Sequence, residues 1–300
     1  MPACLPMLSM PIKKVLIVAK KSAYQTYFNE YQERPLRKLA LKGDKALLHI
    51  RRSHNTHYQT LSFVKDVLKK RRIAARVFFR GESFNPKKYD LVISVGGDGS
   101  FLEASHRLDD QMILGVNSDQ NHSVGKLCIA NRANFEKCFD KILSGHFYIQ
   151  KLNRLKIYFN GAPLKFFVLN DILISHICPA AMSHYVLKIG KTVERQRSSG
   201  VWVSTAAGSS AAIHSAGGRP MKQASAQLQY FPRELFEGHG QRYHLTGGVL
   251  PEGQSLSIVS QMQEGMLYLD GAHHSKSFDY GDEIKVSNGL PLKAVRFTPQ

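Results

Sequence analysis

One carboxylate in this chain lies among glycines, an arrangement suited to phosphate chemistry. Residues 96–100 read Gly-Gly-Asp-Gly-Ser and directly follow the apolar run Leu91–Val95. Glycine lets a backbone turn tightly and bring its N–H groups close to a ligand. A helix that begins here adds the partial positive charge of its N-terminus. The sequence therefore predicts a phosphate-binding loop around Asp98, made by Gly96, Gly97, Gly99 and Ser100.

Asp98 needs a chemical task, because its negative charge would otherwise repel a neighbouring phosphate. A carboxylate in that position can hold Mg²⁺, or it can take a proton from an attacking hydroxyl. Phosphoryl transfer depends mostly on positioning and charge neutralisation, and a free hydroxyl is a poor nucleophile. We therefore interpret Asp98 as the base of a phosphoryl transfer, with a simple turn as the structural alternative.

Two other segments carry residue types that suit a nucleoside. Residues 204–212 read Ser-Thr-Ala-Ala-Gly-Ser-Ser-Ala-Ala, and residues 215–218 read Ser-Ala-Gly-Gly. Small side chains permit close approach of a flat base or a phosphate, and hydroxyls supply donors. Asn170 and Asp171 follow the apolar run 166–169, where an amide and a carboxylate can bind ribose hydroxyls and a base. Each segment alone is equally compatible with a turn that binds nothing.

The first half of the chain alternates strand and helix patterns. Buried strands are expected at 14–19, 76–79, 91–95 and 112–116, and helices at 57–72 and 100–108, the latter capped by Ser100. This alternation predicts a doubly wound α/β domain. Ligands of such domains bind beyond the carboxyl ends of the strands, which is where the glycine loop lies.

The second half has a different character. After a connecting helix at 135–143, short alternating segments occur at 155–159, 165–169, 185–189, 200–204, 255–259, 266–269 and 283–286, separated by Gly-containing turn signals. Short strands with frequent turns predict an antiparallel, sandwich-like β-rich domain. We place the boundary near 148, so that the α/β domain with the phosphate loop is 1–148 and the β-rich domain is 149–300.

Composition limits the other possibilities. With 41 Lys and Arg against 23 Asp and Glu, the formal net charge is +18, which suits nucleic acid or small polyanions. No nucleic-acid recognition motif accompanies the basic clusters, so nucleic acid is not expected as a partner. No apolar run approaches a membrane span. Cys4, Cys128, Cys138 and Cys178 are scattered, as in reduced proteins, and the start lacks a presequence pattern, which together predict a cytoplasmic location.

The histidines do not predict a metal centre. His49, His54 and His57 have no cysteine or carboxylate partner at zinc-ligand spacing, and we interpret them as surface histidines. No metal-ligating residue is therefore predicted.

In this order along the chain, GGDGS, LNDILIS and STAAGSSAAIHSAGG resemble the NAD kinase family. The likeness runs from Lys14 to about Asp270 and includes the GVN of 115–117 and the MLYLDG of 266–271. KVLIVAK, VNSDQNHSVGKLC and ERQRSSG are similar to the mitochondrial-type branch, which also occurs in bacteria.

The resemblance implies transfer of a phosphoryl group from ATP with Mg²⁺, or from polyphosphate, to the 2′-hydroxyl of the adenosine ribose of NAD, giving NADP. It implies that Asp98 is the base, that the loop glycines line the phosphates, and that Arg195 and Arg197 neutralise phosphate. The implied NAD-binding residues are Asn117, Asn170, Asp171, Thr205, Ser209 and Ser210. A homodimer or larger homo-oligomer is also implied.

Some residues depart from the family pattern. Ser199-Gly200 stands where many members have Asp-Gly, and Ala212 ends a stretch that usually ends in tyrosine. These changes leave the preference between NAD and NADH open. Two alternatives remain: a diacylglycerol- or sphingosine-type lipid kinase, which shares the GGDG loop, and a non-enzymatic nucleotide- or nucleic-acid-binding protein. Such a binding protein would have no use for Asp98 among phosphates.

Overall fold

Apolar runs rich in branched residues form a mainly parallel sheet in the first unit. The computed structural model describes residues 11–35, 38, 42, 45–240 and 242–297. Its sheet has seven strands in the order β2-β1-β3-β4-β19-β6, with β5 paired to β4. The strands are β1 (Lys14–Ala19), β2 (Ala74–Phe79), β3 (Leu91–Gly96), β4 (Met112–Asn117), β5 (Ala130–Asn131), β6 (Tyr148–Leu152) and β19 (Leu292–Arg296).

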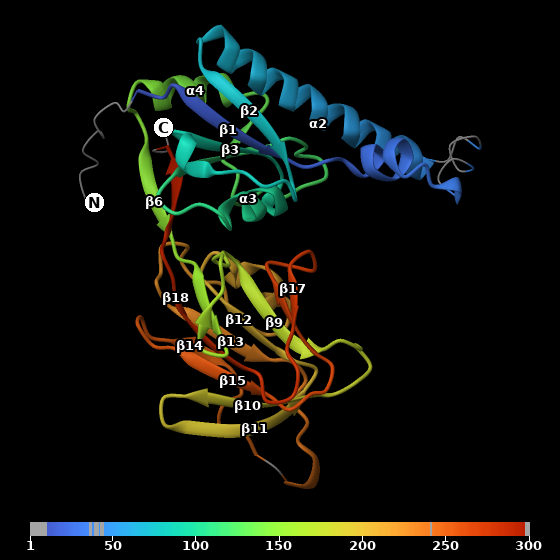
Figure 1. Ribbon diagram of the computed structural model, residues 1–300, viewed down its shortest axis with the longest axis vertical. Coiled ribbons are helices and arrows are strands. Elements are labelled where there is room, and N and C mark those ends of the chain that lie inside the picture. Colours follow the sequence, from blue (N-terminus) through green and yellow to red (C-terminus); the bar gives the residue numbers. More distant parts are fainter. Residues whose placement is uncertain (1–10, 36–37, 39–41, 43–44, 241, 298–300) are drawn as a thin grey trace. The chain divides into compact units, whose positions relative to one another are not determined.

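Helices cover both faces of this sheet, which explains why its central strands are continuously apolar. Figure 1 shows α2 (Lys45–Lys70) and α4 (Phe135–Leu143) on one face and α3 (Asp98–Ser105) on the other. Val64 and Leu68 of α2 share a core with Phe139 of α4 and Ile93 of β3. Two short helical segments, η1 (Tyr24–Glu30) and η2 (Pro86–Lys88), lie on the connections.

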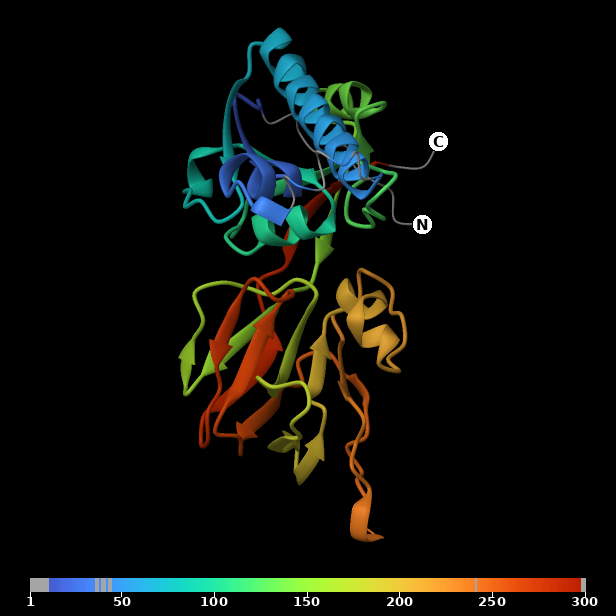
Figure 2. The same cartoon turned by 90° about the vertical axis from the view of Figure 1, so that its right-hand side faces the viewer.

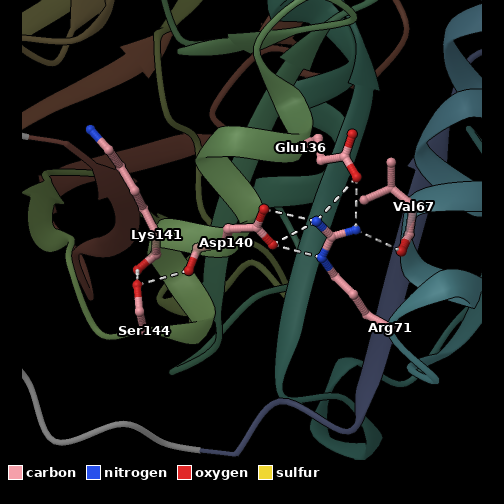
Figure 3. A network of polar contacts seen from close by, with 6 residues as sticks. All are labelled: Val67, Arg71, Glu136, Asp140, Lys141 and Ser144. Atoms are coloured by element: carbon pink, nitrogen blue, oxygen red, sulfur yellow. Dashed lines mark hydrogen bonds and ion pairs between the residues drawn. The ribbon is translucent and has the colours of Figure 1, made fainter.

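An ion-pair network joins the end of α2 to α4 (Figure 3). The Arg71 guanidinium donates to both carboxylate oxygens of Asp140 at 2.7 and 2.8 Å and to Glu136 at 3.2 Å. It also donates to the carbonyl oxygen of Val67 at 3.3 Å. Because a guanidinium matches a carboxylate with two parallel hydrogen bonds, this contact fixes the packing of the two helices.

The second part of the chain is a β-sandwich. One six-stranded sheet has the order β11-β10-β15-β18-β7-β8 and the other the order β14-β13-β12-β9-β16-β17. Ile172, Ile174 and Val203 of one sheet share a single core with Leu187 and Ile258 of the other. The strands are β7 (Leu155–Phe159), β8 (Ala162–Pro163), β9 (Asp171–His176), β10 (Ser183–Ile189), β11 (Thr192–Ser198), β12 (Val201–Ser204), β13 (Leu228–Pro232), β14 (Gly248–Leu250), β15 (Leu256–Ser260), β16 (Gly265–Leu269), β17 (Ser275–Ser277) and β18 (Glu283–Asn288). Short helical segments are η3 (Gly208–Ser210), α5 (Ala212–Ser215) and η4 (Gly238–Gly240), and Figure 2 shows this part from the side.

The predicted fold class, an α/β domain followed by a β-rich domain, is confirmed. The chain forms two units, one ending at Gln150 and resuming at Lys293, the other spanning Lys151–Leu292. The assignment of all of 149–300 to the second domain was wrong at its end, because β19 pairs in parallel with β4 in the first sheet. Pairing over such a separation in sequence leaves no local pattern. Among the described residues, no helix has both the length and the apolar character needed to cross a bilayer.

Several predicted elements differ at their bounds. Helix α2 begins at Lys45 rather than near His57. The run 165–169 forms only an isolated bridge, between Val168 and Leu155, and the strand begins after it, at Asp171. Asn170 and Asp171 therefore lie at the start of a strand and not at the end of one.

Candidate active site

The glycine loop connects a buried strand to a helix. Strand β3 ends at Gly96, Gly97 is the N-cap in extended conformation (φ −105°, ψ −163°), and α3 begins at Asp98. The first N–H groups of a helix have no intrahelical acceptor, so this end carries partial positive charge. Ser100 was predicted as the cap but lies inside the first turn of α3. Its hydroxyl is buried and has no hydrogen-bond partner among the described residues.

Two glycines of this loop lie where a side chain would meet a neighbour. A Cβ at Gly96 would lie 2.7 Å from the Cβ of Ser100, and a Cβ at Gly97 would lie 3.1 Å from the Cβ of Ser123. A Cβ at Gly99 would meet only Arg80 Nη1, at 3.7 Å, which is ordinary contact. The backbone at Gly96 therefore leaves no space for a side chain, and a side chain at Gly97 would require the side chain of Ser123 to move.

The carboxylate of Asp98 is held by backbone amides. Its Oδ1 accepts the N–H of Leu127 at 2.8 Å, and its Oδ2 accepts the N–H of Lys126 at 3.0 Å. Both amides belong to the 118–129 loop, which connects β4 to β5. One hydrogen bond on each oxygen leaves a lone pair on each oxygen for a substrate proton or a cation. Asp98 thus has a fixed orientation without an ion-pair partner among the described residues.

Asn117 shapes the same loop. This residue ends β4 and is buried. Its Nδ2 donates to the carbonyl of Ser123 at 3.0 Å, and its Oδ1 accepts the N–H of Asp119 at 3.1 Å. Gly125 has φ +62°, and a Cβ there would lie 2.9 Å from Cγ of Asn117. The side chain predicted to lie near a dinucleotide therefore organises the loop that holds Asp98.

Two basic residues beside the loop were missed by the sequence analysis. Lys20 directly follows β1 and Arg80 directly follows β2. A Cβ at Gly96 would lie 3.8 Å from Lys20 Cγ, and one at Gly99 would lie 3.7 Å from Arg80 Nη1. The sequence feature that could have found them is a basic residue immediately after each parallel strand. The carboxyl ends of parallel strands lie at one edge of the sheet, where ligands bind.

The prediction that His57 is a surface histidine was wrong. The side chain is buried and connects the segments that follow β1 and β4. Its Nε2 lies 2.9 Å from the carbonyl oxygen of Lys20, and its Nδ1 lies 2.8 Å from the hydroxyl oxygen of Ser118. Burial lowers the pKa of His57 to about 4. The ring is therefore neutral near pH 7, so Nε2–H donates to Lys20 and Nδ1 accepts from Ser118. The ends of β1 and β4 are held together through this ring.

In the second unit, one carboxylate holds the turn before β9. Asp270 accepts the backbone N–H groups of Leu169 at 2.8 Å, Asn170 at 2.6 Å and Asp171 at 3.1 Å. The Asp171 side chain is also buried, and burial together with the nearby Asp270 raises its pKa to about 7. The Asn170 Oδ1 is buried without a hydrogen-bond partner among the described residues. An unsatisfied amide oxygen of this kind favours a ligand that donates a hydrogen bond.

The predicted hydroxyl residues pack against this turn. Thr205 Oγ1 donates to the carbonyl of Leu169 at 2.5 Å, and Ser209 Oγ donates to the carbonyl of Ala206 at 2.8 Å. Both side chains are buried, whereas Ser210 is half-buried. A Cβ at Gly208 would lie 2.6 Å from Asn170 Cα. The small residues therefore allow the turn that follows β12 to pack against the turn before β9. The hydroxyls of Thr205 and Ser209 donate hydrogen bonds to carbonyl groups of these turns.

Arg195 and Arg197 lie elsewhere in the sandwich. Both are exposed on β11, the edge strand of the sheet that does not contain β9 and β12. Figure 1 shows β11 at the end of this unit opposite the start of β9. Within the described part of the second unit, no hydrogen bond or ion pair connects these arginines to Asn170, Asp171 or Thr205.

Comparison with known proteins identifies the family. A protein of Oryza sativa named "Probable NADH kinase" is 35% identical over 320 aligned positions, which cover 95% of this chain and 97% of that protein. The chain belongs to the NAD kinase family. No family model matches the chain.

Two solved structures of this family share the fold. An NAD kinase from Archaeoglobus fulgidus in complex with ATP gives a TM-score of 0.68 at 21% identity, covering 95% of this chain and 93% of that one. Yeast NADH kinase complexed with NADH gives a TM-score of 0.67 at 16% identity, covering 96% and 84%. The family resemblance drawn from the three segments is thereby confirmed.

Proposed function

We propose that this chain is an NAD(H) kinase that transfers a phosphoryl group from ATP to the 2′-hydroxyl of the adenosine ribose. The observation that carries the proposal is the fixed carboxylate of Asp98 at the N-terminus of α3, beside Lys20 and Arg80. Family membership supports the reaction, since the rice relative is named as an NADH kinase and the archaeal neighbour is in complex with ATP. Polyphosphate is the alternative donor.

Asp98 would act as the base. The two amide hydrogen bonds hold its carboxylate in one orientation, and each oxygen keeps a lone pair that can accept the proton of the 2′-hydroxyl. A positioned base of this kind accelerates proton-coupled transfer by about 10²–10⁴-fold. The neutral ring of His57 has no such role, because both of its nitrogens are bonded to Lys20 and Ser118.

Positive charge would stabilise the transferring phosphoryl group. The open N–H groups at the start of α3, the ammonium of Lys20 and the guanidinium of Arg80 would supply it. Mg²⁺ in phosphate sites is typically held by one or two carboxylates together with substrate phosphates, and Asp98 with its free lone pairs fits that requirement. The ion, when bound with ATP, would neutralise charge on the donor phosphates.

The turn before β9 would bind the nucleoside. Asn170 Oδ1 would accept a hydrogen bond from adenine or ribose, and Asp171 would bind ribose hydroxyls. Thr205, Ser209 and Ser210 would shape the wall beside them, and Asn117 would position its loop. The family resemblance implies that Arg195 and Arg197 bind phosphate, but both lie on β11, away from this turn, so their role stays a prediction from the sequence. A homo-oligomeric state and a cytoplasmic location remain predictions from the sequence.

A purified sample incubated with Mg²⁺, ATP and either NAD or NADH tests the proposal. We expect the corresponding phosphorylated dinucleotide, detected by coupling to an NADP-specific dehydrogenase after chromatography. Diacylglycerol and sphingosine in place of the dinucleotide are the controls for the lipid-kinase alternative. Phosphorylation of either lipid without phosphorylation of NAD or NADH would contradict the proposal.

A further inference from the structure

The N-terminal half of α2 borders a cavity lined by polar side chains in the first unit. The cavity measures about 440 Å³ and is lined by His49, Arg52, Asn55, Thr56 and Gln59 of α2 and by Asn121 and His122 of the 118–129 loop. We call it the α2 pocket. Its helix residues lie on one stripe because side chains three and four residues apart share a helix face. None of the residues that line it is acidic.

His122 is held in place at the wall of the α2 pocket. Its Nδ1 lies 2.7 Å from the Oδ2 of Asp119, and the same oxygen accepts a hydrogen bond from Ser53 of α2 at 2.6 Å. Burial alone would raise the pKa of Asp119, but the hydrogen bonds from Ser53 and His122 outweigh it and lower that pKa. Asp119 is therefore a buried carboxylate anion that orients the imidazole and leaves Nε2 for another partner. The ring of His49 contacts the ring of His122 edge to face at 4.1 Å between centroids.

Arg52 adds a charge that is not neutralised. Among the described residues its guanidinium makes no ion pair, and its side chain lines the α2 pocket. Arg71, beyond the other end of the same helix, has two carboxylates, Glu136 and Asp140 (Figure 3). Arg71, directly after α2, is thus neutralised, whereas the exposed Arg52, like its neighbour Arg51, makes no ion pair among the described residues.

We propose that the α2 pocket binds the phosphate group of a small phosphorylated molecule. A guanidinium offers paired donors that match phosphate oxygens, and two imidazoles can add ring N–H donors. The amides of Asn55, Gln59 and Asn121 supply further donors around them. A volume of this size is within the range of small-ligand sites, and it exceeds what one phosphate fills, so the ligand carries an organic or second phosphate group.

A ligand in the α2 pocket would be coupled to the phosphate loop through the 118–129 loop. The 118–129 loop carries His122 in the α2 pocket, and it carries the amides of Lys126 and Leu127 that hold Asp98. Asn117 ties the two parts of the loop together through Asp119 and Ser123. A ligand that contacts Asn121 and His122 would therefore act on the orientation of Asp98. Linkage requires that substrate binding at Asp98 acts on the α2 pocket to the same extent.

Pyrophosphate is the probe for the test. It is titrated into the full chain while the ring signals of His49 and His122 and the amide signals of Lys126 and Leu127 are followed by NMR. We expect saturable shifts of both rings and both amides with one dissociation constant. Arg52→Gln should weaken binding, measured at the ring signals, at least about tenfold, since it removes a charge-assisted contact. Arg51→Gln is the matched control, because Arg51 is exposed on α2 outside the pocket.

The ring signals distinguish this site from the phosphate loop. Shifts confined to residues 97–100 would show that pyrophosphate binds only at the proposed active site and would overturn the proposal. Equal weakening by Arg51→Gln and Arg52→Gln would show nonspecific attraction to basic surface and would also overturn it. Thermal unfolding of both variants should match the wild type, which excludes misfolding as the cause of a loss.

Discussion

Two carboxylates in this molecule make the same contact in different surroundings. Asp98 in the first unit accepts two backbone N–H groups of the 118–129 loop, and Asp270 in the second unit accepts three from residues 169–171. Asp98 lies at a helix N-terminus beside Lys20 and Arg80, whereas Asp270 lies beside another carboxyl group, Asp171. A carboxylate bound to amides is therefore no sign of catalysis by itself, and the neighbouring charges decide what it can do.

The difference in charge has opposite consequences. Around Asp98, partial and full positive charges favour anionic phosphate oxygens next to a carboxylate. At Asp171, burial and then the negative charge of Asp270 favour the protonated form, and the pKa of Asp171 rises to about 7. The first environment suits group transfer between anions, and the second suits hydrogen bonding to a neutral nucleoside.

Replacing Asp98 by Asn tests whether its surroundings make it a base. The amide keeps one acceptor for the loop, loses the other and cannot take a proton, so turnover should fall by about 10²–10⁴-fold, with a loss of about 1–3 kcal/mol in the free energy of unfolding. Steady-state kinetics with ATP and NAD measure the loss. Asp90→Asn is the matched control, because Asp90 also accepts two backbone N–H groups, those of Lys13 and Lys14, at 2.8 Å. Near-wild-type turnover in Asp98→Asn would remove the base from the mechanism.

The pH dependence of the free energy of unfolding tests the neutral state assigned to His57. Its pKa is about 4 in the folded chain and about 6.5 when exposed, so the unfolded chain binds more protons between these values. The free energy of unfolding should therefore fall by up to about 3 kcal/mol as the pH decreases from 6.5 to 4. Urea denaturation at several pH values measures this, and His57→Gln should remove that part of the dependence. An unchanged profile in the variant would show that His57 does not carry it.

Asp270→Asn tests the structural role of the second carboxylate. Weakening three hydrogen bonds to a charged acceptor should lower the free energy of unfolding by about 1–3 kcal/mol and raise the KM for NAD more than it lowers kcat. Glu194→Gln provides the control in the same unit, because Glu194 accepts the N–H groups of His244 and Leu245. That variant should lose stability while its KM stays near the wild-type value. A large fall in kcat with unchanged KM in Asp270→Asn would reverse the roles assigned to the two carboxylates.

Asp171 is expected to give the smallest effect. Its pKa of about 7 means that the carboxylate forms as the pH rises through neutrality, and a carboxylate accepts ribose hydroxyls more strongly than the acid does. The affinity for NAD should therefore increase a few-fold, about 1 kcal/mol, between pH 6 and 8. Calorimetric titration measures it, and Asp171→Asn should give a flat profile. The same increase in the variant would assign the titration to another group.

Local sequence patterns predicted the structural features that depend on residues adjacent in the sequence. The buried run before Gly96 and the three glycines around Asp98 determine a strand, a tight turn and a helix start without help from distant residues. The order of the three polar segments was enough to identify the family. The roles assigned to Arg195 and Arg197 stay predictions, as does the binding of NAD by Asn170 and Asp171.

Features that depend on distant pairing escaped prediction. Lys20 and Arg80 come to Gly96 and Gly99 only because parallel strands align their carboxyl ends. His57 is buried because α2 begins well before it and turns that residue toward Lys20 and Ser118. The strand at 171–176 was missed because Asn-Asp is a strong turn signal, and here it opens the strand instead of following one.

The position of β19 has a consequence for synthesis of the chain. This strand lies between β4 and β6 in the first sheet, yet it is made after the entire second unit. Until residues 292–296 leave the ribosome, β4 has an unpaired edge where β19 belongs, and unpaired strand edges invite pairing with other chains. The first sheet of the nascent chain can therefore be completed, at Met112 and Ile113 of β4, only after synthesis of the second unit has ended.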